Sequence, residues 1–226
     1  EPLKLDLADL DSVARCADGL VSQQVTLDVL LNNAGLISKT RGETRQGFET
    51  HFGVNHLGHF LFTIKLLPVL RRSQAPRAVH LSSDAMQIAS TDARFSDLQW
   101  TERDYDTWVS YGDSKLMNLL FSRELAEREP WLVSHAVHPG MVPTSLVGEP
   151  DTEALLLALR GIRHMRPVWQ GAASSVYAAV HERTREAPSG YFAFCRPHPQ
   201  HPFADRSEVR EVLWDISQER VAGWLS

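Results

Sequence analysis

The sequence predicts an α/β protein with a doubly wound parallel sheet of the Rossmann-like type. Short apolar stretches that suit buried strands alternate along the chain with longer helical patterns. The expected strands end in small or polar residues, in the sequences DL, NNAG, SS and HPG. Because parallel strands end at the same edge of a sheet, these residues should line one rim, where such sheets bind ligands.

Local patterns predict the elements in chain order. Residues 1–10 alternate apolar and polar positions as a strand does, and Asp6 and Asp9 precede the first helix. The other strands are expected over residues 27–35, 77–83, 132–140 and 189–195. The helices are expected over residues 11–21, 48–70, 110–129, 170–182 and 207–221. With no repeat, low-complexity tract or linker, residues 1–226 are expected to form one domain.

The composition argues against nucleic acid as a partner. The 23 Lys and Arg residues oppose 28 Asp and Glu residues, and no basic cluster exceeds short loops such as residues 160–167. Two cysteines, Cys16 and Cys195, rule out a disulfide framework and fit a reducing compartment. No apolar run reaches the ~18 residues of a membrane span, since the longest contains Lys65 and Pro68. We expect a cytoplasmic protein.

Tyr111 and Lys115 lie four residues apart at the start of the helix expected over residues 110–129. This spacing places both side chains on one face, one turn apart. A phenol has a pKa near ~10, and a neighbouring cation favours its ionised form. The spacing alone is weak evidence for a function, so the role of the pair depends on the surrounding sequence.

Five motifs occur in one order on this βα ladder: NNAG, VNHLGHF, HLSS, YGDSK and HPGMVPT. In these motifs the sequence resembles the short-chain dehydrogenase/reductase family. The segments FGVNHLGHFLFT, SKLMNLLFSREL and GYFAFC resemble the retinol dehydrogenase and WW-domain oxidoreductase branch. The resemblance implies hydride transfer between a nicotinamide cofactor and an alcohol or carbonyl compound. The implied cofactor is NADP, with NAD as the alternative.

The resemblance also implies roles for four side chains. Tyr111 would be the acid/base, and Lys115 would lower the phenol pKa and bind the nicotinamide ribose. Ser83 would polarise the substrate oxygen, with Ser82 as the competing candidate. Asn55 would hold a water that links Lys115 to solvent, and its amide must be hydrogen bonded inside an apolar helix. A purely structural role for Ser83 and Asn55 stays open.

Cofactor contacts are implied at the ends of the expected strands. The residues are Asp6, Leu7, Asn33, Ala34, Gly35, Tyr111, Lys115, Pro139, Gly140, Val142 and Thr144. The small residues among them let the backbone come close to the adenosine ribose. No metal site is expected, because the histidines at 51, 56 and 59 lack an HExxH pattern. We interpret them as histidines on a helix surface.

The family's glycine-rich turn, which holds the cofactor's pyrophosphate at a helix N-terminus, does not occur in the sequence. We therefore expect an N-terminally truncated chain whose first βαβ portion is missing. A membrane anchor ahead of Glu1 stays open. The truncation predicts weak dinucleotide binding and an exposed sheet edge that favours a homo-oligomer.

The segment after Thr144 stands where the family has its mobile substrate flap. Leu155, Leu156, Leu157 and Leu159 make it strongly apolar, which favours a small apolar alcohol or carbonyl substrate. Packing against the core, a membrane or a partner subunit is the alternative use of these leucines. Two further functions stay open: a non-catalytic truncated homologue, and a protochlorophyllide-reductase-like enzyme with the same YxxxK and NHLGHF motifs.

Overall fold

A computed structural model describes residues 2–142, 146 and 166–225. Four strands form a parallel sheet in sequence order: β1 (Val29–Asn32), β2 (Arg77–Leu81), β3 (Val133–His138) and β4 (Ser189–Ala193). β5 (Arg196–Pro197) pairs antiparallel with β4 at the edge. The prediction of a parallel α/β sheet is confirmed.

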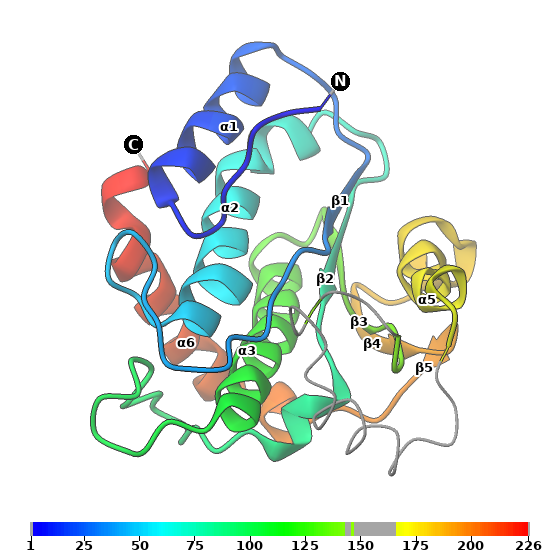
Figure 1. Ribbon diagram of the computed structural model, residues 1–226. Coiled ribbons are helices and arrows are strands. Elements are labelled where there is room, and N and C mark those ends of the chain that lie inside the picture. The colour runs from blue at the N-terminus through cyan, green and yellow to red at the C-terminus, as the bar shows by residue number, and fades with distance from the viewer. Residues whose placement is uncertain (1, 143–145, 147–165, 226) are drawn as a thin grey trace.

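The sheet is covered by helices on both faces. The α-helices are α1 (Leu10–Ser22), α2 (Gly58–Leu70), α3 (Thr107–Arg128), α5 (Val168–Val180) and α6 (Ser207–Val221). Figure 1 shows α1, α2, α3 and α6 on one side of the sheet and α5 on the other. Among the described helices, none is both long and apolar enough to cross a membrane.

Side-chain caps explain where several helices begin. The Asp9 carboxylate accepts the backbone N–H of Asp11 at the start of α1. The Asp106 carboxylate accepts the N–H groups of Trp108 and Val109 at the start of α3. Both satisfy donors that the helix itself leaves unpaired. The Asp106 cap holds the first turn of α3 in place.

Helix α3 runs through the middle of the core. Its residues from Ser110 to Ser122 are all buried, between the sheet on one side and α2 and α6 on the other. A helix buried on every side needs no polar face. Polar residues on α3 therefore have to find hydrogen-bond partners inside the protein.

A π-helical segment, His51–Leu57, leads into α2 without a break. The sequence predicts one helix over residues 48–70, so the helical prediction is confirmed and the π geometry is new. Single π-helical turns inside helices are frequent at functional sites. This segment carries Asn55.

Two sequence predictions differ from the structure. Residues 2–9 form no strand, and Leu3 and Leu5 are exposed, because an alternating pattern becomes a strand only where it finds a pairing partner. The second is the missed β4–β5 hairpin. Phe194 and Cys195 form its two-residue turn, with positive φ angles of 56° and 58°. Turn positions with positive φ usually carry Asn and Gly, so the sequence did not indicate this turn.

Candidate active site

The residues singled out in the sequence meet at the carboxyl ends of the strands. Asn33 follows β1, Ser83 follows β2, and Pro139 follows β3. Tyr111 and Lys115 come to the same edge from the first turns of α3. In doubly wound sheets this edge binds ligands.

Tyr111 and Lys115 are both buried and face each other along α3. The Lys115 ammonium lies 5.3 Å from the centre of the Tyr111 ring. Its Nζ donates a hydrogen bond to the Leu81 carbonyl at the end of β2, at 3.2 Å. This bond ties the lysine to the sheet.

Burial changes the acidity of both groups. It lowers the pKa of the Lys115 ammonium to about 8 and raises the pKa of the Tyr111 phenol to about 12, against a hydrogen bond from Ser83 that lowers it. Burial outweighs the hydrogen bond from Ser83, so the phenol of the protein alone is neutral at pH 7. The lowering of the phenol pKa by Lys115 stays a prediction.

The two serines after β2 have different partners. Ser83 hydrogen bonds the Tyr111 phenol, and its Oγ accepts the backbone N–H of Ala85 at 3.1 Å. Ser82 is buried, and its Oγ donates to the Lys115 backbone carbonyl at 2.7 Å. Ser83 therefore lies beside the Tyr111 hydroxyl, while Ser82 fastens α3 to the sheet.

Asn55 holds the loop that follows β1. Its Oδ1 accepts the backbone N–H of Leu36 at 3.0 Å, and its Nδ2 donates to the carbonyl of the same residue at 3.0 Å. Nδ2 also reaches Ser114 Oγ at 3.1 Å. The prediction that this buried amide is hydrogen bonded is confirmed.

The loop after β1 comes close to the lysine at Gly35. A Cβ added at Gly35 would lie 3.2 Å from Asn55 Oδ1 and 3.4 Å from Lys115 Nζ. Asn33 and Ala34 beside it are exposed. The loop therefore offers accessible backbone next to the ammonium, as the resemblance implies for a cofactor contact.

The remaining cofactor candidates differ in how they are placed. Asp6 is exposed, and its carboxylate accepts the backbone N–H of Ala8. The Leu7 side chain is buried next to Gly58, so only its backbone is available to a ligand.

At the end of β3, Gly140 has a φ of 82°, and Pro139 precedes it. A Cβ on Gly171 would collide with the Val142 side chain, so Val142 packs against α5. Thr144 and the flap leucines lie outside the described residues.

The interpretation of three histidines as surface residues is wrong. His51, His56 and His59 are all buried, because the π-helical segment is enclosed on all sides. His56 bonds Ser217 Oγ at 2.8 Å, and His59 Nδ1 lies 3.0 Å from the Asn55 carbonyl. Within the described residues, no group of three His, Cys, Asp or Glu side chains is placed to hold a metal.

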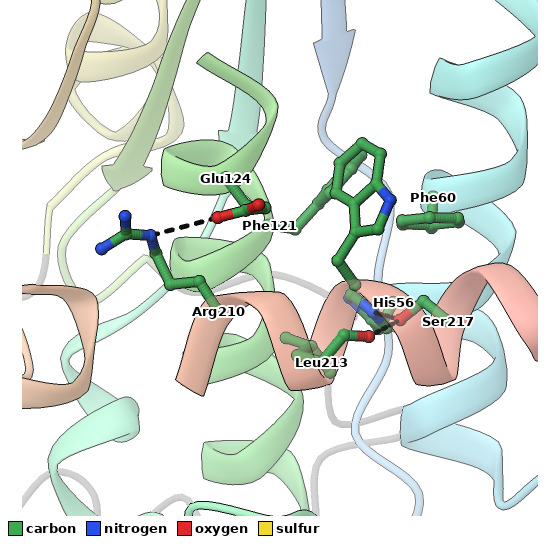
Figure 2. A pocket seen from close by; sticks show the side chains of 8 residues that line it. His56, Phe60, Phe121, Glu124, Arg210, Leu213 and Ser217 are labelled. Atoms are coloured by element: carbon green, nitrogen blue, oxygen red, sulfur yellow. Dashed lines mark hydrogen bonds and ion pairs between the residues drawn. The ribbon is translucent and has the colours of Figure 1, made fainter. Parts of the chain in front are cut away.

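Around His56 the core encloses a small apolar gap, which Figure 2 shows between α6 and the helices that carry Phe60 and Phe121. Arg210 and Glu124 close one side of it with an ion pair at 3.4 Å. The gap is part of the packed core and has no room for a ligand.

Sequence reasoning missed a carboxyl-centred cluster beside Ser83. Asp84 accepts a hydrogen bond from the Tyr191 hydroxyl at 3.0 Å, and the rings of His198 and His138 lie 3.3 and 3.5 Å from its oxygens. The only signal in the sequence was the position of Asp84 directly after Ser83.

The chain is similar to known proteins along nearly its whole length. A family model described as short chain dehydrogenase matches residues 1–93. Retinol dehydrogenase 12 of Bos taurus is 38% identical over 218 residues, which cover 96% of this chain and 68% of the relative. Retinol dehydrogenase 14 of Homo sapiens is 37% identical over 223 residues, which cover 96% and 66%. The chain thus spans about two thirds of these relatives.

Solved structures have the same fold. An uncharacterised protein from Mycobacterium paratuberculosis aligns with a TM-score of 0.73 and 33% identity, over 96% of this chain and 74% of that one. A short chain dehydrogenase from Burkholderia cenocepacia, solved in complex with NADP, aligns with a TM-score of 0.62 at 18% identity, over 84% and 73% of the two chains.

Proposed function

The chain belongs to the NAD(P)-dependent short-chain dehydrogenases/reductases, in the retinol dehydrogenase branch, and we propose that it interconverts an apolar alcohol and its carbonyl compound through Tyr111, Lys115, Ser83 and Asn55. The observation that carries this proposal is the convergence of Ser83 and Lys115 on the Tyr111 phenol at the carboxyl ends of β2 and β3.

The residues present fit the nicotinamide end of a dinucleotide. An ammonium has three hydrogen-bond donors, and the Leu81 carbonyl is the partner that Lys115 Nζ has among the described residues. Gly35 leaves open the space beside Nζ that a side chain would fill. Lys115 would bind the hydroxyls of the nicotinamide ribose there, and the bound ring would supply or accept the hydride.

Tyr111 moves the proton in this proposal. During reduction its O–H donates to the substrate oxygen as the carbonyl carbon receives the hydride, and during oxidation the phenolate takes the alcohol proton. Because burial keeps the phenol neutral in the protein alone, oxidation needs the positive charge of the oxidised nicotinamide next to it. Ser83 donates to the same substrate oxygen and stabilises its developing charge.

Lys115 and Asn55 support this proton transfer. The ammonium stabilises the phenolate electrostatically from its fixed place below the ring. Asn55 holds the loop at Leu36 and thereby the backbone beside Nζ. A water held there would connect Lys115 to solvent, as the resemblance implies.

Exposed apolar side chains near the site support an apolar substrate. Ile88 follows Ser83 on the same short helical turn and would touch a Cβ on Gly112, next to Tyr111. Trp108 precedes Tyr111 on α3, and both Ile88 and Trp108 are about half exposed. An apolar rim of this kind binds substrate by desolvation. A higher kcat/KM for small polar aldehydes than for matched apolar ones would contradict this substrate class.

Three further parts of the proposal rest on the sequence analysis. Residues 1–226 belong to one domain, the cofactor is NADP with NAD as the alternative, and the protein acts in the cytoplasm. The ratio of kcat/KM for NADPH and NADH tests the cofactor. A homo-oligomer through the edge of the sheet is tested by sedimentation of the purified protein.

The Tyr111→Phe substitution tests the function. It removes the proton donor and keeps the ring, so kcat should fall by a factor of about 10² or more, a larger change than that in cofactor affinity measured by calorimetry. A Tyr111→Phe protein with near-normal kcat overturns the assignment. Absence of dinucleotide binding in the wild type would favour the non-catalytic homologue. Activity on protochlorophyllide alone would favour the protochlorophyllide-reductase-like enzyme.

A further inference from the structure

We propose that His51 is a positioning residue for Tyr111, which it orients through a fixed imidazole tautomer and through Ser110. This inference rests on the proposed function, in which Tyr111 is the acid/base. His51 lies on the π-helical segment and is completely buried. Its ring packs edge-to-face against the Tyr111 ring, with 6.0 Å between the centroids and 70° between the planes.

The hydrogen bonds of His51 fix which nitrogen carries the proton. The backbone N–H of Ser38 donates to Nε2 at 2.9 Å, so Nε2 is unprotonated. Burial, with the charge of Lys115, lowers the pKa of the imidazole to about 4. The ring is therefore neutral at pH 7, and its single proton sits on Nδ1.

The Nδ1–H faces the start of α3. Ser110 Oγ lies 2.9 Å from Nδ1 and the Tyr105 hydroxyl oxygen 3.1 Å from it. Tyr105 donates its own proton to Glu49 Oε1 at 2.9 Å, so its oxygen remains an acceptor. Because Ser110 directly precedes Tyr111, the bond to Ser110 anchors the backbone that carries the phenol.

Glu49 completes this hydrogen-bond network at the start of the π-helical segment. Its carboxyl oxygens accept the backbone N–H groups of His51 at 3.0 Å and Phe52 at 2.8 Å, the first donors of the π-helical segment. Burial raises the pKa of Glu49, and these hydrogen bonds oppose the rise. The carboxyl group thus fixes the backbone position from which His51 reaches Tyr111 and Ser110.

His51 has two separable tasks. It stands one turn before Asn55, and the two side chains hold the same loop, at Ser38 and Leu36. It also contacts Tyr111 and Ser110. In His51→Gln the amide oxygen extends toward the place of Nε2 and can still accept from Ser38, whereas the ring contact and the Nδ1–H donor are lost. This variant isolates the second task.

The first experiment reads the tautomer without any assay of activity. Side-chain ¹⁵N chemical shifts of His51 in the wild-type protein should show a protonated Nδ1 and an unprotonated Nε2, unchanged between about pH 6 and 8.5, where the protein is folded. A proton on Nε2, or a titration near the ordinary histidine pKa, overturns the proposal.

The second experiment compares two equally buried histidines by steady-state kinetics. In His51→Gln, kcat should fall about tenfold, and the KM for the cofactor should stay within about twofold, because a misaligned donor slows proton transfer without weakening dinucleotide binding. The matched control is His135→Gln on β3, whose ring bonds the Thr184 carbonyl. It should lose comparable Tm and keep kcat within about twofold.

Normal kcat in His51→Gln, or a loss of kcat that follows Tm in both histidine variants, overturns the positioning role. If His51→Gln does not fold, Ser110→Ala removes one acceptor atom, and a kcat at least threefold lower is expected; unchanged kcat overturns the proposal. The proposed function is judged separately: it fails if Tyr111→Phe is active, whatever the His51 variants show.

Discussion

Lys115 and Tyr111 face each other across 5.3 Å, measured from Nζ to the ring centre, yet the lysine's hydrogen bond goes to the Leu81 carbonyl rather than to the phenol. The sheet therefore fixes the cation, and its charge acts on Tyr111 through space. Burial disfavours the charged form of each residue when it stands alone. An ionised Tyr111 and a charged Lys115 would stabilise each other electrostatically.

Stability should rise with pH between 8 and 9.5 because of Lys115. Its folded pKa of about 8 lies below the ordinary lysine value of 10.5, so the unfolded chain binds more protons in this window. The linkage relation then gives a gain of about 1.5 kcal/mol in the free energy of unfolding. Urea denaturation at several pH values measures it. The gain should vanish in Lys115→Met, and an equal gain in that variant would refute the assignment.

Substitutions of Ser83 and Ser82 should have different effects on kcat. Ser83→Ala removes the hydroxyl that hydrogen bonds Tyr111, and the loss of a donor at the developing oxyanion should reduce kcat by a factor of about 10². Ser82→Ala removes the hydrogen bond to the Lys115 carbonyl, which should cost about 1 kcal/mol of stability and reduce kcat far less. The same kcat loss in both variants would contradict the separation of their roles.

Acid should unfold the protein through its buried histidines. Burial lowers the pKa of His51, His59 and His135 to about 4 and that of His56 and His80 to about 3. The folded state therefore stays unprotonated while the unfolded chain takes up protons below pH 6.5, so stability is present above pH 6.5 and is lost as the pH falls.

At pH 5.5 each of the five groups costs between about 1 and 2 kcal/mol, or about 7 kcal/mol together. Typical stabilities are about 5–15 kcal/mol, so circular dichroism should show cooperative unfolding between about pH 5 and 6. Substitution of the exposed His181 by Gln should leave the curve in place. A native spectrum with undiminished urea resistance at pH 4.5 would contradict the prediction.

The fold could be predicted from the sequence because its strongest elements are local. The terminal helix is expected over residues 207–221 and observed as Ser207–Val221, and the buried strands read as short apolar runs. The strand at residues 1–10 failed because pairing, not alternation, makes a strand. The turn at Phe194 and Cys195 could not be predicted, because it contains neither glycine nor asparagine, the residues typical of such turns.

The site could be predicted only in part. Tyr111 and Lys115 stand on one helix, so their spacing indicates their contact. The partner of Asn55 is the backbone of Leu36 on a different element, and no local pattern specifies it. The histidines at 51, 56 and 59 were interpreted as surface residues, although all three are buried. The burial of a helix is normally predicted from an apolar stripe on one face, and a segment that is buried on every side has no such stripe.

Gly35→Ala should damage cofactor binding with little loss of stability. The added methyl carbon would lie 3.2 Å from Asn55 Oδ1 and 3.4 Å from Lys115 Nζ, so it would fill the space beside the ammonium and push at both side chains. In the proposed function this raises the Kd for the dinucleotide about tenfold or more, while Tm falls by only a few degrees.

The matched control is Gly19→Ala on α1, where an added Cβ meets nothing within 4 Å. This substitution should stabilise the helix by up to about 1 kcal/mol and leave the Kd unchanged. Calorimetric titration with NADP and NAD measures both variants against the wild type. If Gly35→Ala binds the dinucleotide as the wild type does, the loop after β1 is not the surface on which the cofactor lies, and Lys115 would have to meet the ribose from another side.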